Sequence, residues 1–277
     1  MVAEALGLVG LWRGGERLPA LDPADRGLAY GDGLFETLRA CRGRLPWWPR
    51  HRARLAAGAA RLGLPLPDEA VLDQALAEGL ARAPEGVIKL VLTRGSGGRG
   101  YLPPAAPQPL LACFTAPLPP PPEAPLVVDL LELRLARQPA LAGLKHLNRL
   151  EQVLGAREAA QRGLDEGLMA DEAGQLVCAT RGNVFVRLDG AWLTPPVDRA
   201  GVAGIARGLL LERWPALAEA PLALADLARA EALFLANAVR GILPVGRCGG
   251  RVLSSESPGL AEARAVLAAS HPGFSGS

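Results

Sequence analysis

The sequence predicts a mixed α/β protein of two domains joined by a proline-rich segment. Its 277 residues suit two domains of ordinary size, roughly 150 residues each. Segments with strand-like and helix-like apolar patterns alternate along both halves of the chain. Between them, residues 117–125 contain six prolines, which neither a helix nor a central strand tolerates. We therefore expect a smaller domain over 1–116, a linker over 117–125 and a larger domain over 126–277.

Turn residues and apolar spacing place the expected elements of the first domain. Gly14-Gly15 marks the turn of an opening hairpin. Leu55, Ala59 and Leu62 recur at helical spacing, and Pro84 ends a second helix. The expected elements are a hairpin over 7–19, strands over 34–39, 87–93 and 110–115, and helices over 50–62 and 69–82.

The second domain shows the same alternation of strand and helix patterns. Leu147, Leu150, Val153 and Leu154 cluster on one face of an expected helix. The expected elements are strands over 126–133, 176–177, 184–188 and 232–236, and helices over 147–161, 205–214 and 220–231.

Composition and charge exclude several classes of function. The formal net charge is +2 and the charged residues are scattered, so we expect no nucleic-acid partner. No run approaches the ~18 apolar residues of a membrane span, and Glu4 stands where a signal peptide carries positive charge. The four cysteines and three histidines lack metal-binding spacing. We therefore expect a cytoplasmic protein without a membrane anchor, a metal site or a disulfide framework.

A glycine-rich segment, Gly95–Gly100, fits the GxGxxG pattern of dinucleotide sites. Such a site needs a helix that opens at the glycines, so that the helix N-terminus can bind pyrophosphate. Pro103-Pro104 follows too closely for a helix to form, and the acidic residue expected about 20 positions later is missing. We interpret the segment as a clamp for a carboxylate or another anion, with Arg94 and Arg99 as its charges.

Lysine is rare in this chain, because only Lys89 and Lys145 occur among 30 lysines and arginines. An amine can lose its proton and form a Schiff base with a carbonyl, which a guanidinium cannot do. Composition alone leaves open that both lysines are incidental. Lys145 lies directly before an expected helix, whereas Lys89 lies within an expected strand and its role stays open.

A second feature is typical of a phosphate site. Small residues at 200–204 precede the helix expected from Ile205, and a helix N-terminus offers free N–H groups to an anion. Arg54, on the exposed side of an earlier helix, can add a charge-assisted hydrogen bond. A reactive lysine together with a phosphate site indicates pyridoxal phosphate.

Several blocks of this sequence occur in the order that is typical of one enzyme family. They are Asp25–Thr37, His51–Leu55, Thr93–Tyr101, Lys145–Gln152, Asn183–Phe185, Gly201–Ile205, Asn237-Ala238 and Pro244-Val245. In these blocks the chain resembles the fold-type IV pyridoxal-phosphate enzymes, which include branched-chain and D-amino acid aminotransferases and aminodeoxychorismate lyases. The blocks at 94–101 and 145–152 resemble the lyase branch, since a D-amino acid aminotransferase would carry histidine in place of Tyr101.

The resemblance implies a homodimeric lyase that converts 4-amino-4-deoxychorismate to 4-aminobenzoate and pyruvate, in folate biosynthesis, with pyridoxal 5'-phosphate as its cofactor. It implies that Lys145 binds the cofactor as a Schiff base and moves the substrate proton. The other cofactor-binding residues that it implies are Arg54, Cys178, Gly204, Ile205, Asn237 and Ala238. The substrate-facing residues that it implies are the catalytic Thr37 together with Tyr30, Arg94, Arg99 and Tyr101.

Structural interpretations remain open for several of these residues. Arg54 can be a solvated helix charge, Thr37 a strand former and Tyr30 a packing residue beside a glycine turn. Asn237 can be a turn residue.

One position departs from the pattern of the family. The resemblance implies a glutamate five residues before Asn183, where its carboxylate keeps the cofactor's ring nitrogen protonated, but this chain has Cys178 there. A neutral thiol is a weak hydrogen-bond partner for that nitrogen. We hypothesise that Cys178 favours elimination over transamination, or else impairs the enzyme. The alternatives are an aminotransferase for D- or branched-chain amino acids, and a degenerate homologue that binds the cofactor without catalysis.

Overall fold

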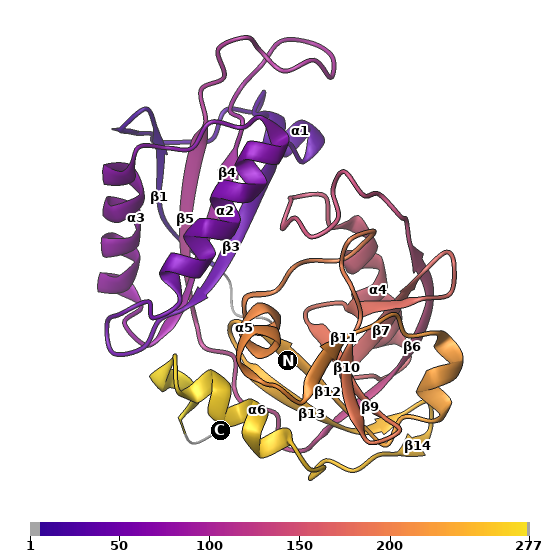
Figure 1. Ribbon diagram of the computed structural model, residues 1–277. Coiled ribbons are helices and arrows are strands. Elements are labelled where there is room, and N and C mark those ends of the chain that lie inside the picture. Colours follow the sequence, from indigo (N-terminus) through magenta and orange to yellow (C-terminus); the bar gives the residue numbers. More distant parts are fainter. Residues whose placement is uncertain (1–5, 276–277) are drawn as a thin grey trace. The chain divides into compact units, whose positions relative to one another are not determined.

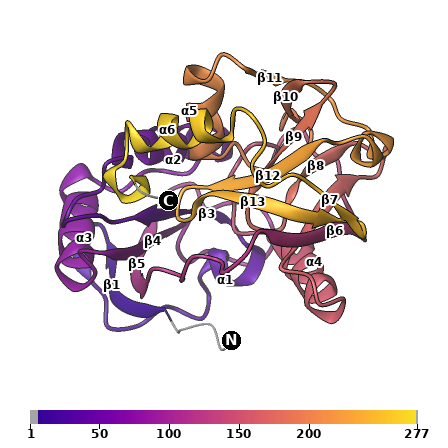
Figure 2. The same cartoon turned by 90° about the horizontal axis from the view of Figure 1, so that it is seen from below.

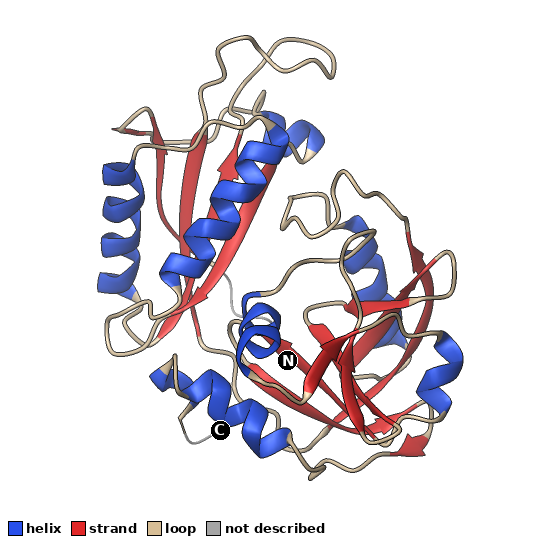
Figure 3. Cartoon of the chain, viewed as in Figure 1, coloured by secondary structure: helices blue, strands red, loops and turns tan. Residues whose placement is uncertain are grey.

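The computed structural model describes residues 6–275 of the chain, which divide into two units. Unit 1 runs to Leu118 and also includes Lys145–Asn148, while unit 2 comprises Pro119–Leu144 and the chain from Arg149 onward. Both units combine helices with a sheet, as the prediction of an α/β fold requires (Figure 3). Glu4, on which the expectation about secretion rests, lies outside the described residues.

Unit 1 is built on a five-stranded antiparallel sheet in the order β2-β1-β5-β4-β3. Its strands are β1 (Gly7–Arg13), β2 (Glu16–Arg17), β3 (Gly33–Arg39), β4 (Gly86–Thr93) and β5 (Leu110–Pro117). The helices α2 (Trp48–Leu62) and α3 (Glu69–Arg82) cover one face of this sheet, and the short α1 (Arg26–Tyr30) precedes β3 (Figure 1). The strands and helices expected for this region are confirmed, with shifts of a few residues at their ends.

Alternation of side chains along β3 separates the two faces of this sheet. The buried residues on the face that α2 and α3 cover are Leu34, Glu36 and Leu38. Phe35 and Thr37 point to the opposite face and are half-buried. The register pairs Thr37 with Lys89 of β4, so these two side chains share the face that the helices leave uncovered.

A short segment from later in the sequence completes unit 1. The backbone N–H of Phe35 donates to the carbonyl of Lys145 at 2.9 Å, and the N–H of Leu147 donates to the carbonyl of Gly33 at 3.0 Å. The segment therefore pairs with β3, the edge strand of the sheet. The expectation differed, because it placed this segment in the second domain and began a helix at Leu147. The helix begins at Leu150, since the backbone of the preceding segment is hydrogen-bonded to β3.

Unit 2 contains a nine-stranded mixed sheet in the order β11-β10-β9-β12-β13-β6-β7-β8, with β14 beside β13. Its strands are β6 (Leu126–Leu135), β7 (Glu166–Asp171), β8 (Leu176–Ala179), β9 (Asn183–Leu188), β10 (Ala191–Thr194), β11 (Leu217–Glu219), β12 (Ala232–Asn237), β13 (Gly241–Cys248) and β14 (Arg251–Val252). Its helices are α4 (Leu150–Gln161), α5 (Ile205–Arg213) and α6 (Leu260–Ala268). The antiparallel strands β12 and β13 lie side by side near the centre of this sheet (Figure 2).

The prediction of a helix over 220–231 is wrong. The region holds an extended stretch and a single 3₁₀ turn, Leu224–Ala228. The carbonyl of Leu222 instead accepts the N–H of Leu176 at 2.8 Å, and the Leu222 side chain is buried among the strands. The elements β7, β10, β11, β13, β14 and α6 of unit 2 were not predicted.

The helix α4 exposes most of the apolar face that its sequence predicts. Leu150, Val153 and Leu154 are 76%, 59% and 45% exposed within the described chain. Gly155 and Ala159 are the buried residues of this helix, which packs against β6 and β7. The helix thus packs through its smallest side chains and leaves the apolar stripe at the surface.

No helix among residues 6–275 is long and apolar enough to cross a membrane. All four cysteines are free thiols with buried side chains. No group of three histidine, cysteine or carboxylate side chains in this range is arranged to hold a metal ion.

Candidate functional site

Lys145 is held firmly at the edge of the sheet in unit 1. Its carbonyl accepts the N–H of Phe35, and Asn148 Nδ2 donates to the carbonyl of Gly31 at 3.1 Å, so the segment is bound to unit 1 at two points. Lys145 Nζ lies 4.1 Å from the centre of the Phe35 ring. The structure therefore presents the amine from a rigid backbone, as expected for a residue that must meet a carbonyl in a fixed geometry.

Lys89, the other lysine of the chain, lies close to the same ring. Its Nζ is 5.2 Å from the centre of Phe35. Burial lowers the pKa of Lys89, and no neighbouring charge of the described residues contributes to that shift. Both lysines therefore meet at Phe35, and Lys89 is a half-buried cation that shares a sheet face with Thr37.

Tyr30 ends α1 and contacts the glycine-rich loop. Its ring meets the ring of Tyr101 edge to face, with centroids 5.5 Å apart. The guanidinium of Arg26 lies 4.9 Å from the centre of the Tyr30 ring. Both tyrosine rings remain exposed in the described chain, which leaves them accessible to a small molecule.

Arg54 is paired with a buried carboxylate that sequence reasoning missed. Glu36 is 1% exposed, and its two oxygens accept hydrogen bonds from Arg54 Nε at 2.8 Å and Nη2 at 2.5 Å. Burial by itself would raise the pKa of Glu36, but the hydrogen bonds from His51 and Arg54 outweigh it and hold that pKa at about 2. The expectation of Arg54 on the exposed side of its helix is wrong, since its side chain is 14% exposed and fixed by two hydrogen bonds.

His51 is the second member of this cluster that the sequence did not single out. Its Nδ1 lies 2.6 Å from Glu36 Oε2, and its ring is buried. Burial lowers the pKa of His51 more than Glu36 raises it, so the ring is neutral near pH 7 and donates its Nδ1 proton. Glu36 occupies an apolar position between Leu34 and Leu38, and that break in the pattern was the available signal.

The Arg94 side chain is buried and forms hydrogen bonds within unit 1. It is 4% exposed, and its Nε donates to Asp32 Oδ2 at 2.8 Å. Its Nη1 and Nη2 donate to the carbonyls of Gly63 and Leu62 at 2.7 and 2.8 Å, which are groups at the C-terminus of α2. Arg94 therefore ties α2 to the turn before β3, and we remove it from the expected carboxylate clamp.

Arg99 and Tyr101 lie on the exposed glycine-rich loop. Arg26 holds this loop, because its Nη1 and Nη2 donate to the carbonyls of Gly100 and Tyr101 at 3.1 and 2.7 Å. No helix begins at the glycines. The segment therefore lacks the helix N-terminus that a dinucleotide site needs, as predicted. Arg99 is a solvent-exposed cation on a loop whose backbone is anchored, and it stays a candidate for binding a carboxylate.

The N-terminus of α5 in unit 2 has the features expected of a phosphate site. Gly204 is its N-cap, and no side chain caps the helix, so the N–H groups of its first turn are available to an anion. A Cβ at Gly204 would lie 2.0 Å from Asn183 Oδ1, so a larger residue there would displace the Asn183 side chain. Asn183 Nδ2 donates to the carbonyl of Val202 at 2.9 Å and holds the loop that leads into the helix.

Asn237 shapes the turn between β12 and β13. Its Oδ1 accepts the N–H groups of Val239 and Arg240 at 3.0 and 2.8 Å, and its Nδ2 donates to the carbonyl of Arg181 at 3.2 Å. The side chain is thus a turn former, as one interpretation held. A contribution of this turn to phosphate binding must come from the backbone of Asn237 and Ala238.

Cys178 lies in β8 within an apolar cluster of unit 2. Burial raises the pKa of its thiol to about 12, although the nearby Arg149 opposes the shift. Cys178 is therefore neutral near pH 7 and provides no negative charge. The nearby Glu166 already accepts hydrogen bonds from Thr180 Oγ1 and from Arg181 Nε, the latter at 2.9 Å.

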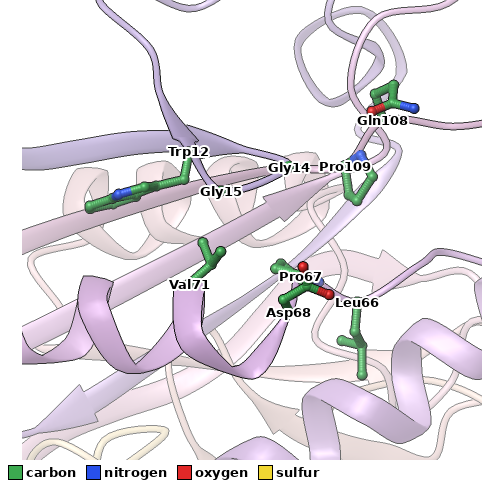
Figure 4. A pocket seen from close by; sticks show the side chains of 9 residues that line it. All are labelled: Trp12, Gly14, Gly15, Leu66, Pro67, Asp68, Val71, Gln108 and Pro109. Carbon is green, nitrogen blue, oxygen red and sulfur yellow. The ribbon is translucent and has the colours of Figure 1, made fainter.

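A small pocket of unit 1 lies between the opening hairpin and the start of α3 (Figure 4). The residues that line it are Trp12, Gly14, Gly15, Leu66, Pro67, Asp68, Val71, Gln108 and Pro109. None of the residues expected to bind cofactor or substrate belongs to this lining. The pocket is therefore separate from the candidate site.

The chain is similar to known proteins over most of its length. Residues 33–248 match the family described as amino-transferase class IV. The crystal structure of 4-amino-4-deoxychorismate lyase from Pseudomonas aeruginosa is 42% identical, has a TM-score of 0.83 and covers 93% of this chain and 96% of that one. Aminodeoxychorismate lyase of Vibrio harveyi is 33% identical over 230 residues, 80% of this chain and 84% of that protein. A fold IV transaminase from Curtobacterium pusillum is 29% identical, with a TM-score of 0.77 and coverage of 91% and 89%. These similarities confirm the expected fold class.

Proposed function

Because the chain belongs to the class IV amino-transferase family, we propose that it is a pyridoxal-phosphate-dependent lyase. Its substrate is 4-amino-4-deoxychorismate and its products are 4-aminobenzoate and pyruvate, a reaction of folate biosynthesis that we assign to the cytoplasm. The observation that carries the proposal is Lys145, one of two lysines, held against β3 with its amine beside Phe35.

The residues present fit the phosphate and the aldehyde of pyridoxal phosphate. The uncapped N-terminus of α5, where Gly204 leaves no room for a Cβ, supplies N–H donors for the phosphate. Arg54, oriented by Glu36, supplies positive charge, and Lys145 supplies the amine. When bound, the cofactor withdraws electrons from the carbon that carries the substrate amine, so that the proton on this carbon can be removed.

Lys145 Nζ is the base that takes this proton. The bond between the neighbouring ring carbon and the enolpyruvyl oxygen then breaks, and the remaining ring becomes aromatic. The departing enolate takes up one proton and becomes pyruvate, so protons balance over the reaction. Thr37 and Tyr30 orient the substrate ring, while Lys89 and Arg99 supply positive charge for one of its carboxylates.

Incubation of the purified protein with 4-amino-4-deoxychorismate and pyridoxal phosphate tests this function. The lyase forms 4-aminobenzoate, detected by its fluorescence, and an equal amount of pyruvate, detected with lactate dehydrogenase. Exchange of D-alanine or leucine with a keto acid, without 4-aminobenzoate, would identify an aminotransferase instead. Cofactor binding without either reaction would identify the degenerate homologue.

Arg99→Ala is expected to raise KM for the substrate by about tenfold or more, because a charge-assisted hydrogen bond to a carboxylate is lost. The dissociation constant of the cofactor should not change, since Arg99 lies on an exposed loop. Steady-state kinetics together with a cofactor titration measure both quantities. Arg44→Gln, at another exposed arginine of unit 1, is the control. If KM does not change in the Arg99 variant, Arg99 does not bind the substrate and the loop has only a structural role.

Cys178→Glu is expected to raise transamination relative to lyase turnover. A carboxylate near the cofactor's ring nitrogen stabilises its protonated form, whereas the neutral Cys178 thiol does not. Transamination depends more on that electron withdrawal, because elimination is driven by aromatisation of the product. The ratio of keto-acid exchange to 4-aminobenzoate formation measures the effect, and Cys178→Gln is a neutral control of equal size. The idea fails if the ratio stays constant, or if ¹⁵N NMR finds the ring nitrogen already protonated in the wild type.

We also propose that the protein works as a homodimer. The exposed stripe of Leu150, Val153 and Leu154 on α4 supports this proposal, because a contiguous apolar helix face is typical of a protein interface. A mass of 28.9 kDa measured by light scattering, which is the mass of one chain, would contradict this proposal.

A further inference from the structure

Arg240 lies in the turn between β12 and β13 of unit 2. Its backbone N–H donates to Asn237 Oδ1 at 2.8 Å, which fixes Arg240 as the last residue of the turn between β12 and β13. Asn237 Nδ2 donates to the carbonyl of Arg181 at 3.2 Å and ties this turn to the turn before β9. The Arg240 side chain therefore starts from an anchored backbone rather than from a free loop.

The turn after β12 is linked through Asn183 to the loop that leads to the proposed phosphate site. Ala236, at the end of β12, pairs with Asn183 of β9. Asn183 Nδ2 in turn holds the carbonyl of Val202, in the loop that leads to Gly204 and α5. The turns that precede α5 and follow β12 are therefore joined through Asn183, at one end of the sheet.

No carboxylate among residues 6–275 forms an ion pair with Arg240. Its Nη2 lies 3.4 Å from the carbonyl of Pro120, at the outer limit of a hydrogen bond. Burial lowers the pKa of the guanidinium, and the neighbouring Arg181 lowers it further. Glu166 is the nearby carboxylate, and it already accepts hydrogen bonds from Thr180 and Arg181. A half-buried cation beside a second cation is costly until an anion binds.

We propose that Arg240 binds one carboxylate of the substrate. This inference rests on the proposed function, because 4-amino-4-deoxychorismate carries two carboxylates that each need a cationic partner. Arg240 serves one of these two carboxylates. A guanidinium suits this role, since its planar fork recognises a carboxylate through two parallel hydrogen bonds.

The two reaction products separate the two carboxylates and serve as probes. 4-Aminobenzoate retains the carboxylate of the ring, and pyruvate retains the carboxylate of the departing group. Isothermal titration of each product into the cofactor-loaded protein, wild type and Arg240→Gln, measures the two affinities without turnover. The variant is expected to raise the dissociation constant of one product about tenfold or more. The affinity for pyridoxal phosphate and the Tm should stay unchanged, and Arg240→Lys should restore part of the product affinity.

Arg229→Gln is the matched control, because Arg229 is an exposed arginine of unit 2 that already pairs with Asp189 at 2.5 Å. It should leave both product affinities unchanged. The proposal is wrong if neither product binds the Arg240→Gln protein more weakly. It is also wrong if the variant loses affinity for pyridoxal phosphate instead, since Arg240 would then serve the cofactor. Failure of the proposed function is distinguishable, because it appears in the wild type as a lack of 4-aminobenzoate formation.

Discussion

Lys145→Arg is expected to abolish covalent attachment of the cofactor and to reduce lyase turnover by about 10³-fold or more. A guanidinium keeps the positive charge of the side chain but cannot lose its proton near neutral pH, so it can act neither as nucleophile nor as base. The fold should persist, because the backbone of this segment makes the contacts to β3. Borohydride reduction followed by peptide mapping locates the cofactor, and the coupled assay measures turnover.

The second lysine provides the control for this experiment. The chain has only Lys89 and Lys145, so a reduced cofactor can be assigned to one of two peptides. Lys89→Arg should still carry the label on Lys145. A label on Lys89 in the wild type, or no label in a cofactor-saturated sample, would contradict the assignment of Lys145.

Glu36 is expected to make the stability of the protein fall steeply in acid. Its pKa is about 2 in the folded chain, below the ordinary value of 4.5, because His51 and Arg54 hold the charged form. A carboxyl whose pKa is lowered on folding stabilises the fold above its unfolded pKa and loses that contribution as pH falls toward the folded pKa. The contribution is on the order of 3 kcal/mol at neutral pH and disappears between about pH 4.5 and pH 2.

Urea unfolding of the wild type and Glu36→Gln across this pH range tests the prediction. The free energies of unfolding should differ most near pH 7 and converge in acid, because the variant lacks the titrating group. The matched control is Glu69→Gln, which removes an exposed carboxylate paired with Arg52 and should change stability by less than about 1 kcal/mol. A pH-independent difference for Glu36→Gln would show that Glu36 is not the titrating group. If that variant does not fold, the protons taken up when the wild type unfolds measure the same quantity.

The orientation of Arg54 connects this stability prediction to the proposed cofactor site. Glu36 accepts hydrogen bonds from both Nε and Nη2 of Arg54, so its loss removes two contacts that orient the guanidinium. We therefore expect Glu36→Gln to bind pyridoxal phosphate more weakly than the wild type. This functional consequence distinguishes Glu36 from a residue whose role is confined to stability.

Local patterns in the sequence were sufficient for much of unit 1 and for the chemistry of Lys145. Apolar periodicity and turn glycines act over a few residues, so the strands β3 and β4 and the helix α3 could be predicted without knowledge of their neighbours. Lys145 could be singled out because its chemical capacity belongs to the amine itself. The small residues before Ile205 likewise indicated an open helix N-terminus, a property of the local backbone.

The tertiary structure alone decided which of these residues have partners distant in the sequence. The segment after Leu144 is not yet helical because its hydrogen bonds go to β3, more than a hundred positions earlier. Arg94 is buried against the end of α2, whereas Arg99, five residues later, is exposed, although both looked alike as charges of one loop. Glu36 carries its charge in the core because His51 and Arg54 approach it from α2. A pattern of single residues cannot show such contacts, since burial, pKa and rigidity depend on the groups that folding brings together.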